Sequence, residues 1–411
     1  MGPTINAERL LTRLPRERVE PIAVILHDGT GSPAAERLRD AGVRCVVDRR
    51  RRRVQRQIRW FHRTVADLRP DVFVPNLSVA GWYASETIKG WGVATVGAYR
   101  RHDTFNEAMV RRFVLGRPEQ AFDGLVCVSR ASRDGVDAAM QRCGIAGRTE
   151  LAHIASGVPI PPASVAARNP FEVVYLGRLA QSSKRIFDVV DVMTALAKRH
   201  PSMRFRIIGD GPDESAVAAK IDAAGLRDRI NLVGRIPADA LPAALRGGSV
   251  VLQLSAMEGT PASLMDAMAA GLVPVARNVI GGVADLITDR VTGRLLPARS
   301  GAEEVRSAAA AIETLHADLD LWRACSTAGR DRIVSQYSDQ TMIDRWSDLL
   351  DRLPRRPRPT HAFNPPRRLR LPPREPAFGG EDRRWPRPVP LRRIRVAPVE
   401  TPTASDVHRA A

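Results

Sequence analysis

Short apolar runs alternate with segments of helical period along the first 353 residues of the chain. Near-continuous apolar runs are typical of buried parallel strands, and apolar residues recurring about every 3.6 positions predict helices between them. The predicted strands are 22–26, 43–47, 72–74, 93–96 and 124–128 in the first half, and 171–176, 205–208, 250–254 and 273–275 in the second. Residues 230–236 are predicted as a further strand together with the loop that follows it. This alternation predicts an α/β protein with doubly wound parallel sheets.

The chain is long enough for two domains and a separate tail. Its 411 residues exceed what a single core usually serves. The first domain should end in a linker near residues 148–160, where Gly157, Pro159, Pro161 and Pro162 cluster. We therefore expect a first domain over residues 1–158 and a second over 159–335. Residues 354–411 combine recurring arginines with prolines and almost no apolar period, which predicts a disordered tail. The tail could tether the protein to anionic lipid or an acidic protein, or be an extension without a role.

Charge and cysteine content narrow the class of protein. The net charge of +18 favours an acidic partner, which could be nucleic acid, anionic lipid or a phosphorylated substrate. Nucleic acid ranks last, because the tail offers hardly any aromatic platform for stacking bases. The four cysteines form no CxxC pair or Cys/His cluster, which argues against a zinc site and fits a reducing cytosol. We expect a cytoplasmic protein, with a peripheral position on the inner face of the plasma membrane left open.

Residues 49–67 form a basic amphipathic helix in the prediction. Its apolar stripe is Val54, Ile58, Phe61, Val65 and Leu68, and arginines crowd its start. Such a helix can lie on an anionic bilayer, or it can face a core and expose a basic back to solvent. We favour the second interpretation.

The stretch 250–275 carries the first candidate site. A strand leads through a polar loop into a small-residue helix, and this arrangement binds anions in parallel α/β sheets because free N–H groups lie at the helix start. Two carboxylates, Glu258 and Asp266, stand eight positions apart in this stretch. A helix that begins near residue 261 would put Asp266 about one turn in, within reach of the same pocket as Glu258. Taken alone, both could be ordinary surface acids.

A pair of cations follows the strand 171–176. Arg178 lies directly after the strand, and Lys184 stands with Arg185 at the predicted head of the helix 186–198. A forked guanidinium and a point-charge ammonium beside a helix start suit a diphosphate. The alternative is a surface pair. The later Gly209-Asp210-Gly211 lacks the third glycine of a dinucleotide fingerprint, so we reject that interpretation.

Together these motifs resemble a known family. Glu258-Gly259, the run Asp266–Gly271 and Pro274-Val275, set beside Gly177-Arg178-Leu179 and Lys184, resemble retaining, nucleotide-sugar-dependent glycosyltransferases of family 4. The resemblance implies the GT-B fold, in which two Rossmann-like domains face a cleft, and it implies that 336–353 is a helix returning to the first domain. Asp266 departs from the family, which has a glutamate there, and its carboxylate reaches less far.

The resemblance also implies roles for single residues. Arg178 and Lys184 hold the departing diphosphate in place of a metal ion, Glu258 orients the sugar and Asp266 holds the ribose. His102, which follows the strand 93–96, approaches the transferred sugar, although another register puts Arg100 at that position. The other residues expected to line the donor pocket are Gly177, Gly234, Arg235, Ile236, Gly259, Ser263 and Leu264.

The implied activity is transfer of a sugar from a nucleotide-diphosphate sugar to a glycan, lipid or small-molecule acceptor, in cell-envelope or polysaccharide biosynthesis. No metal and no cofactor besides the donor substrate is expected, and the sequence does not indicate an oligomeric state. Two other functions stay open: a nucleotide-sugar epimerase of the same fold, and a non-catalytic sugar-nucleotide-binding or scaffold protein.

One element of such a domain is missing at the start. If Asn6–Arg13 is the first helix, a strand and a glycine-rich turn should precede it, but the sequence starts at Met1-Gly2-Pro3. The coding start could be placed too far downstream, or the domain could lack the strand. We favour the first explanation, because deleting a central strand leaves the backbone groups of its two neighbours unpaired.

Overall fold

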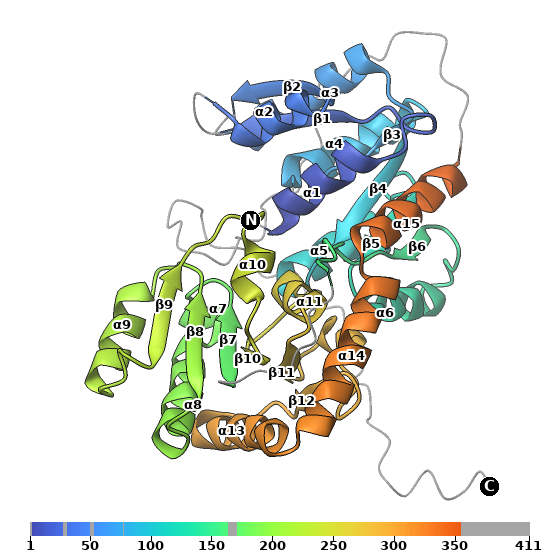
Figure 1. Cartoon of the computed structure of the whole chain (residues 1–411). Helices are drawn as coiled ribbons and strands as arrows, with labels where there is room; N and C mark the ends of the chain where they lie inside the picture. The colour runs from blue at the N-terminus through green and yellow to red at the C-terminus, as the bar shows by residue number, and fades with distance from the viewer. Residues whose placement is uncertain (1, 28–30, 50–52, 77, 163–170, 355–411) are drawn as a thin grey trace, which may run out of the picture. The chain divides into compact units, whose positions relative to one another are not determined.

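The computed structural model describes residues 2–27, 31–49, 53–76, 78–162 and 171–354, and shows an α/β protein (Figure 1). In the first half the elements are α1 (Gly2–Arg13), β1 (Ile22–His27), α2 (Pro33–Asp40), β2 (Arg44–Arg49), α3 (Val54–Leu68), β3 (Val72–Phe73), α4 (Val79–Gly90), β4 (Ala94–Tyr99), α5 (Thr104–Phe113), β5 (Gly124–Cys127), α6 (Arg130–Arg142) and β6 (Glu150–His153). In the second half they are β7 (Glu172–Leu176), α7 (Gln181–Lys184), α8 (Ile186–Arg199), β8 (Arg204–Ile208), α9 (Glu214–Ala223), β9 (Ile230–Gly234), α10 (Leu241–Leu245), β10 (Val250–Gln253), α11 (Ala262–Ala269), β11 (Val273–Arg277), α12 (Val283–Leu286), β12 (Arg294–Leu296), α13 (Gly301–Ala317), α14 (Leu319–Gln336) and α15 (Asp339–Arg352). The predicted α/β class is confirmed.

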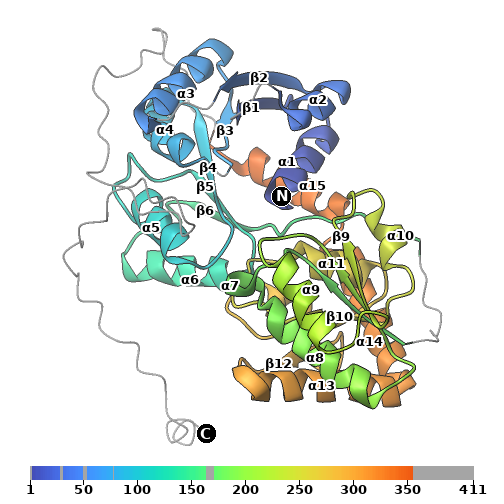
Figure 2. The same ribbon diagram turned by 90° about the vertical axis from the view of Figure 1, so that its left-hand side faces the viewer.

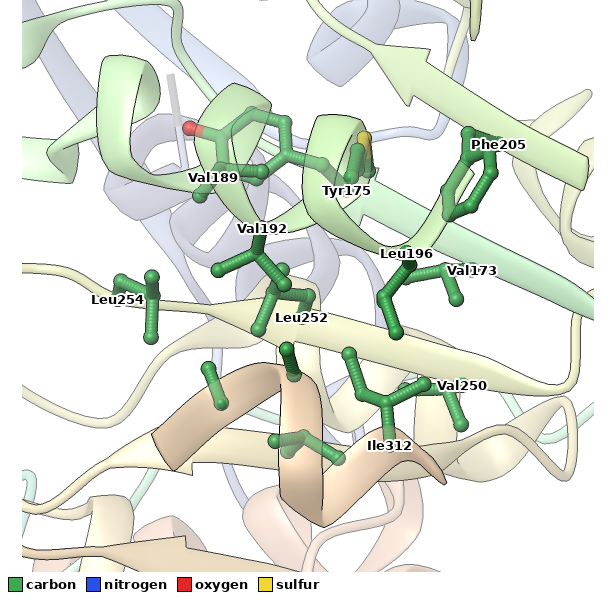
Figure 3. Packing of buried hydrophobic residues seen from close by; sticks show 14 of the residues in the cluster. Val173, Tyr175, Val189, Val192, Leu196, Phe205, Val250, Leu252, Leu254 and Ile312 are labelled. Carbon is green, nitrogen blue, oxygen red and sulfur yellow. The ribbon is translucent and has the colours of Figure 1, made fainter. Parts of the chain in front are cut away.

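The second half contains one continuous parallel sheet of six strands, in the order β12-β11-β10-β7-β8-β9. All four residues of β10 are buried, and they alternate between two cores: Val250 and Leu252 lie in one, Val251 in the other. Figure 3 shows side chains from β7, β10, α8 and α13 gathered in the first core. A strand buried on both faces needs apolar residues at every position, which explains the unbroken apolar runs of the sequence.

The strands of the first half fall into two groups, as can be followed in Figure 2. One parallel sheet contains β1 and β2 alone, and the other has the order β3-β4-β5-β6. Among the described residues, β1 pairs only with β2 and β3 pairs only with β4. Five of the six residues of β1 are only half-buried despite their apolar sequence. Among the described residues, no strand therefore takes the place of the strand that was expected before the first helix.

The last helix, α15, packs against the sheet of the first half. Met342, Trp346 and Leu349 share a core with Val96 and Val126 of β4 and β5. The edge strand β6 lies inside the stretch where the glycine and proline pattern indicated a linker. The chain therefore completes the first sheet before it crosses to the second half and returns through α15.

The basic helix α3 turns its apolar stripe inward. Ile58, Phe61 and Val65 are buried, whereas the side chains of Arg56 and Arg59 are exposed. This is the core-facing arrangement favoured above. Among the described residues no helix is long and apolar enough to cross a membrane. The predicted tail, apart from Pro354, lies outside the described residues.

Candidate functional site

The loop after β7 is fixed by the loop after β8. Leu179 N–H donates to the Asp210 carbonyl at 2.8 Å, and Gln181 N–H donates to Asp213 Oδ2 at 2.7 Å. Gly209 has φ +139°, and a Cβ there would lie 1.9 Å from the Gly177 carbonyl oxygen. Only glycine permits this approach without strain, so the Gly-Asp-Gly motif serves to pack two loops together.

The charged centre of the site is a bond between Lys184 and Glu258. Lys184 Nζ lies 2.5 Å from Glu258 Oε1, and Gln253 Nε2 donates to the same oxygen at 2.8 Å. The Glu258 side chain is 11% exposed. A carboxylate so buried needs this pairing, because removing an isolated charge from water is costly. The centre places a half-buried cation and an oriented carboxylate at the carboxyl ends of β7 and β10.

The predicted helix after Lys184 and Arg185 is present as α8, and a short helix that was not predicted precedes it. Lys184 is the last residue of the short α7, and Arg185 in the left-handed region (φ 52°) separates α7 from α8. The Arg185 guanidinium turns to Asp188 at 2.8 Å and to the buried Glu304 at 2.9 Å. The two adjacent cations therefore point to different partners, and only Lys184 faces Glu258.

The loop that carries Glu258 is held between two pieces of backbone. A Cβ at Gly281 would lie 2.2 Å from the Glu258 carbonyl oxygen, and one at Gly259 would lie 2.1 Å from the carbonyl oxygen of Arg100. The Thr260 hydroxyl donates to the Val128 carbonyl. The paired glycines 281 and 282 thus allow the backbone of the Glu258 loop to come close to them. The same loop connects the second half of the chain to the ends of β4 and β5.

Asp266 is the fifth residue of α11, about one turn into the helix as predicted, and it is half-buried. Burial raises the pKa of Asp266 to about 6, with Asp339 acting in the same direction and Arg9 opposing both. Among the described residues, the side chain of Glu258 bonds to Lys184 and Gln253 and not to Asp266. Asp266 is therefore a separate, weakly compensated acid close to α1 and α15, and its role as a ribose ligand stays a prediction.

The other predicted donor-pocket residues differ in exposure. Arg178 is exposed, and its carbonyl accepts a bond from the Tyr175 hydroxyl at 2.7 Å. Leu264 is fully buried, so it could offer a ligand only its backbone, whereas Ser263 is half-buried in the same first turn of α11. Gly234 is the last residue of β9, with φ +76°, and Arg235 and Ile236 follow it in the next loop.

His102 has partners within its own half of the chain. Its Nδ1 lies 2.9 Å from the Tyr99 hydroxyl and its Nε2 lies 3.1 Å from Glu107. Arg100, the alternative of the other register, abuts Gly259 through its carbonyl and donates to Asn76 through its guanidinium. Burial lowers the pKa of Arg100 to about 10. The backbone of Arg100 is thus in contact with the loop that carries Glu258, and the sugar-facing role of His102 stays a prediction.

Two residues of the site had no predicted role. Gln253 orients Glu258, and Tyr175 supports the backbone of Arg178. The sequence signal that could have identified Gln253 is its position as a polar residue at the carboxyl end of an apolar strand, where ligands of parallel sheets gather. Among the described residues, no group of three His, Cys, Asp or Glu side chains could hold a metal ion.

The second half of the chain is similar in sequence to known glycosyltransferases. Residues 160–332 match the family model "Glycosyl transferases group 1". A putative colanic acid biosynthesis glycosyltransferase, WcaL of Salmonella typhimurium, is 28% identical over 187 residues, which are 44% of this chain and 45% of that protein. The 2-deoxystreptamine glucosyltransferase of Streptomyces kanamyceticus is 35% identical over 124 residues, 30% of this chain and 31% of that protein. The chain thus spans less than half the length of these two relatives.

Solved structures resemble a larger part of the chain. Anabaena HepE in complex with UDP and glucose superimposes with a TM-score of 0.67 at 17% identity, covering 86% of this chain and 96% of that one. The lipopolysaccharide outer core galactosyltransferase WaaB gives a TM-score of 0.64 at 16% identity, with 85% and 96% covered. Residues 160–332 therefore match the glycosyl transferases group 1 family (GT4), and over most of its length the chain has the GT-B fold that these structures share.

Proposed function

We propose that the protein is a retaining glycosyltransferase that uses a nucleotide-diphosphate sugar as its donor. The observation that carries the proposal is the Lys184–Glu258–Gln253 centre, which lies within the family-matched segment. Two cations, the half-buried Lys184 and the exposed Arg178, flank the start of the site and suit a diphosphate. Glu258, fixed on one oxygen by two donors, keeps a second oxygen to orient sugar hydroxyls.

In this mechanism, Arg178 and Lys184 stabilise the negative charge that develops on the leaving diphosphate. Glu258 positions the sugar and Asp266 holds the ribose, while the acceptor enters from the side of β4 and its following loop. Transfer on the same face of the sugar needs no protein nucleophile, because the departing phosphate takes the proton of the acceptor hydroxyl. The similarity to HepE, solved with UDP and glucose, favours a uridine nucleotide as the donor.

The acceptor class follows only from relatives. WcaL is named for colanic acid biosynthesis, and the S. kanamyceticus enzyme for glucosylation of 2-deoxystreptamine. We propose a glycan or lipid-linked acceptor in cell-envelope or polysaccharide biosynthesis, with a small-molecule acceptor as the alternative. The net charge of +18 is compatible with a peripheral position on an anionic membrane.

A thermal-shift panel of UDP, GDP, ADP and their sugars tests the donor. A ligand that binds only the folded state raises its stability, so one nucleotide should shift the unfolding temperature and the other two should not. With the donor known, Glu258→Ala and Lys184→Ala should each lower transfer by about 100-fold or more. Arg306→Ala removes an exposed arginine of α13 and serves as the control with unchanged activity.

The outcomes separate the alternatives. Near-wild-type transfer in either site variant contradicts the site assignment. Conversion of the donor sugar without an acceptor indicates an epimerase. Nucleotide binding without any transfer, tested against glycan, lipid-linked and aminocyclitol acceptors, indicates a non-catalytic protein.

A further inference from the structure

A cavity lies at the β6 edge of the sheet β3-β4-β5-β6, away from the proposed donor site. It has a volume of about 410 Å³, and its floor is the strand β6 from Leu151 to Ile154. Its two walls are the helices α6 and α15, and none of Lys184, Glu258 or Asp266 lines it. Because β6 pairs with β5 on one side only, its other edge is open toward this cavity.

The two helical walls each present a pair of arginines to the cavity. Arg130 and Arg133 lie one turn apart on α6, and Arg345 and Arg352 lie two turns apart on α15. Residues three, four or seven positions apart share one face of a helix, so each pair faces the cavity from a single side. Four guanidinium groups therefore converge on one small volume from two independent elements.

These arginines are only partly neutralised. Arg352 Nε lies 3.0 Å from Glu150, and Arg133 lies 3.2 Å from its neighbour Asp134, both as exposed pairs. Such exposed pairs are weak, so either arginine can exchange its carboxylate for a ligand at little cost. Among the described residues, the guanidinium of Arg130 donates only to the amide oxygen of Gln336, at 3.4 Å. Arg345 has no ion pair or side-chain hydrogen bond with any residue in the described part of the chain.

The floor adds a polar group that lacks a hydrogen bond. His153 Nε2 is buried and has no hydrogen-bond partner among the described residues, and its nearest carboxylate, Asp285, is 3.8 Å away. The His153 side chain is 16% exposed. The lining also contains two exposed acids, Asp134 and Asp348. Its four arginines outnumber these two carboxylates, and His153 adds an unsatisfied ring nitrogen.

We propose that this cavity binds a phosphate-bearing small molecule, with Arg345 and Arg130 as its main ligands and His153 beneath it. Guanidinium groups match phosphate oxygens in forked geometry, and a desolvated nitrogen at the floor gains the partner it lacks. The volume falls within the usual range for small-molecule sites. Leu151 and Ala152 offer an apolar floor for the organic part of a phosphate ester. The site is separate from the proposed donor pocket and does not depend on the proposed function.

Isothermal titration calorimetry on the full chain tests this site, with pyrophosphate and glucose 1-phosphate as the two probes. The experiment uses the R178A/K184A background, so that the proposed donor pocket contributes no diphosphate binding. Both probes should bind, and adding R345A should weaken each by about tenfold or more, because a charge-assisted bond is lost. R345K should recover part of the affinity, since a point charge replaces the fork.

The control is R306A, which removes the same charge from an exposed position of α13, outside the cavity. It should leave both affinities unchanged. Equal weakening by R345A and R306A, or no binding of either probe at millimolar concentration, overturns the proposal. Tighter binding of glucose 1-phosphate than of pyrophosphate supports contact between the floor and the organic part, and the reverse supports an inorganic phosphate site. Circular dichroism of R345A checks that the fold is kept.

Discussion

The two halves of the molecule have related topologies but differ in how their sheets are completed. In the second half, β10 and β7 each have a parallel neighbour on both sides, and both faces of the sheet are buried. In the first half, β1 and β3 each have one described neighbour, and β1 is half-buried. A strand with two neighbours satisfies all its backbone groups, so the difference predicts unequal rigidity. The proposed donor residues therefore stand on the better-supported platform.

The halves meet at the loop that carries Glu258. Gly259 abuts the Arg100 carbonyl, and the Thr260 hydroxyl donates to the Val128 carbonyl. These contacts involve backbone atoms on at least one side. They hold the Glu258 loop against the ends of β4 and β5, so a change in the first half can reach the donor site without touching a donor residue.

The largest expected difference concerns core truncation. Leu252→Ala in β10 removes a side chain that is 1% exposed within a continuous sheet, and should cost about 4 kcal/mol. Ile25→Ala in β1 removes a half-buried side chain beside an open edge, where the surroundings can relax and water can enter, and should cost about 1 kcal/mol. Hydrogen exchange read by mass spectrometry gives the loss of protection in each sheet separately. Equal losses in the two sheets would show that β1 is as well supported as β10.

A smaller difference between the two halves is expected in how their stability depends on pH. His62 of α3 is fully buried against the edge of Trp91, and burial lowers its pKa from 6.5 to about 4. As pH falls, the unfolded chain binds a proton near pH 6.5 while the folded chain binds it only near pH 4. Stability of the first half is therefore intact above pH 6.5 and is lost progressively between pH 6.5 and 4, by about 3 kcal/mol in total.

Substitution of His62 by Leu isolates this contribution. The variant keeps a side chain of similar size that does not titrate, so its stability should depend less on pH between 6.5 and 4 than that of the parent chain. Unfolding midpoints measured in steps across this window, with the exchange of β4 and β10 amides compared, give the difference. His316 of the second half is only half-buried, and burial lowers its pKa, so a smaller response is expected there. If H62L and the parent lose stability in parallel, the buried His62 does not govern the pH response.

How much the sequence predicted also differs between the halves. In the second half, residues buried on both faces of each strand made apolar runs that predicted every strand of the sheet except the short edge strand β12, and the helix start at Ala262 followed from Pro261. The helix that starts at Ile186 was also predicted, but the short α7 before it was not. The break between α7 and α8 depends on Arg185, whose left-handed backbone is fixed by Asp188 and Glu304, the latter 119 positions away.

The remaining gaps have the same physical origin. The contact between Gly259 and Arg100 joins residues far apart in sequence, and glycines 209 and 281 fit backbone that no local pattern reveals. Gln253 could be placed on a strand, but its bond to Glu258 depends on how the following loop folds back. The strand β6 was interpreted as part of a linker because it has only four residues and polar ends, of which Glu150 is exposed and His153 is half-buried. Local periodicity predicts elements, whereas the contacts between loops decide which side chains meet.

The smallest predicted effect is the difference in activity between variants of Arg100 and His102. It decides which of these two residues of the first half serves the proposed reaction. Both ring nitrogens of His102 are engaged by Tyr99 and Glu107, and its side chain is 41% exposed. Arg100 has its backbone against Gly259 and a buried Nε without a hydrogen-bond partner among the described residues. Arg100→Ala should therefore lower kcat/KM by about tenfold, as expected for a lost bond to a charged group. His102→Ala should change it within about threefold, as a surface substitution does.

Transfer kinetics with the donor identified by the thermal-shift panel measure both variants, and Arg101→Ala, an exposed neighbour paired with Asp103 at 2.7 Å, is the matched control. A loss of 100-fold or more in His102→Ala, with Arg100→Ala near the parent, would favour the role that the family resemblance implies for His102. That outcome would require the loop after β4 to release Tyr99 and Glu107 when donor binds, because His102 has no free ring nitrogen in the described contacts. The first half would then adapt around a fixed donor platform, which is the behaviour that its half-buried β1 and two-part sheet already favour.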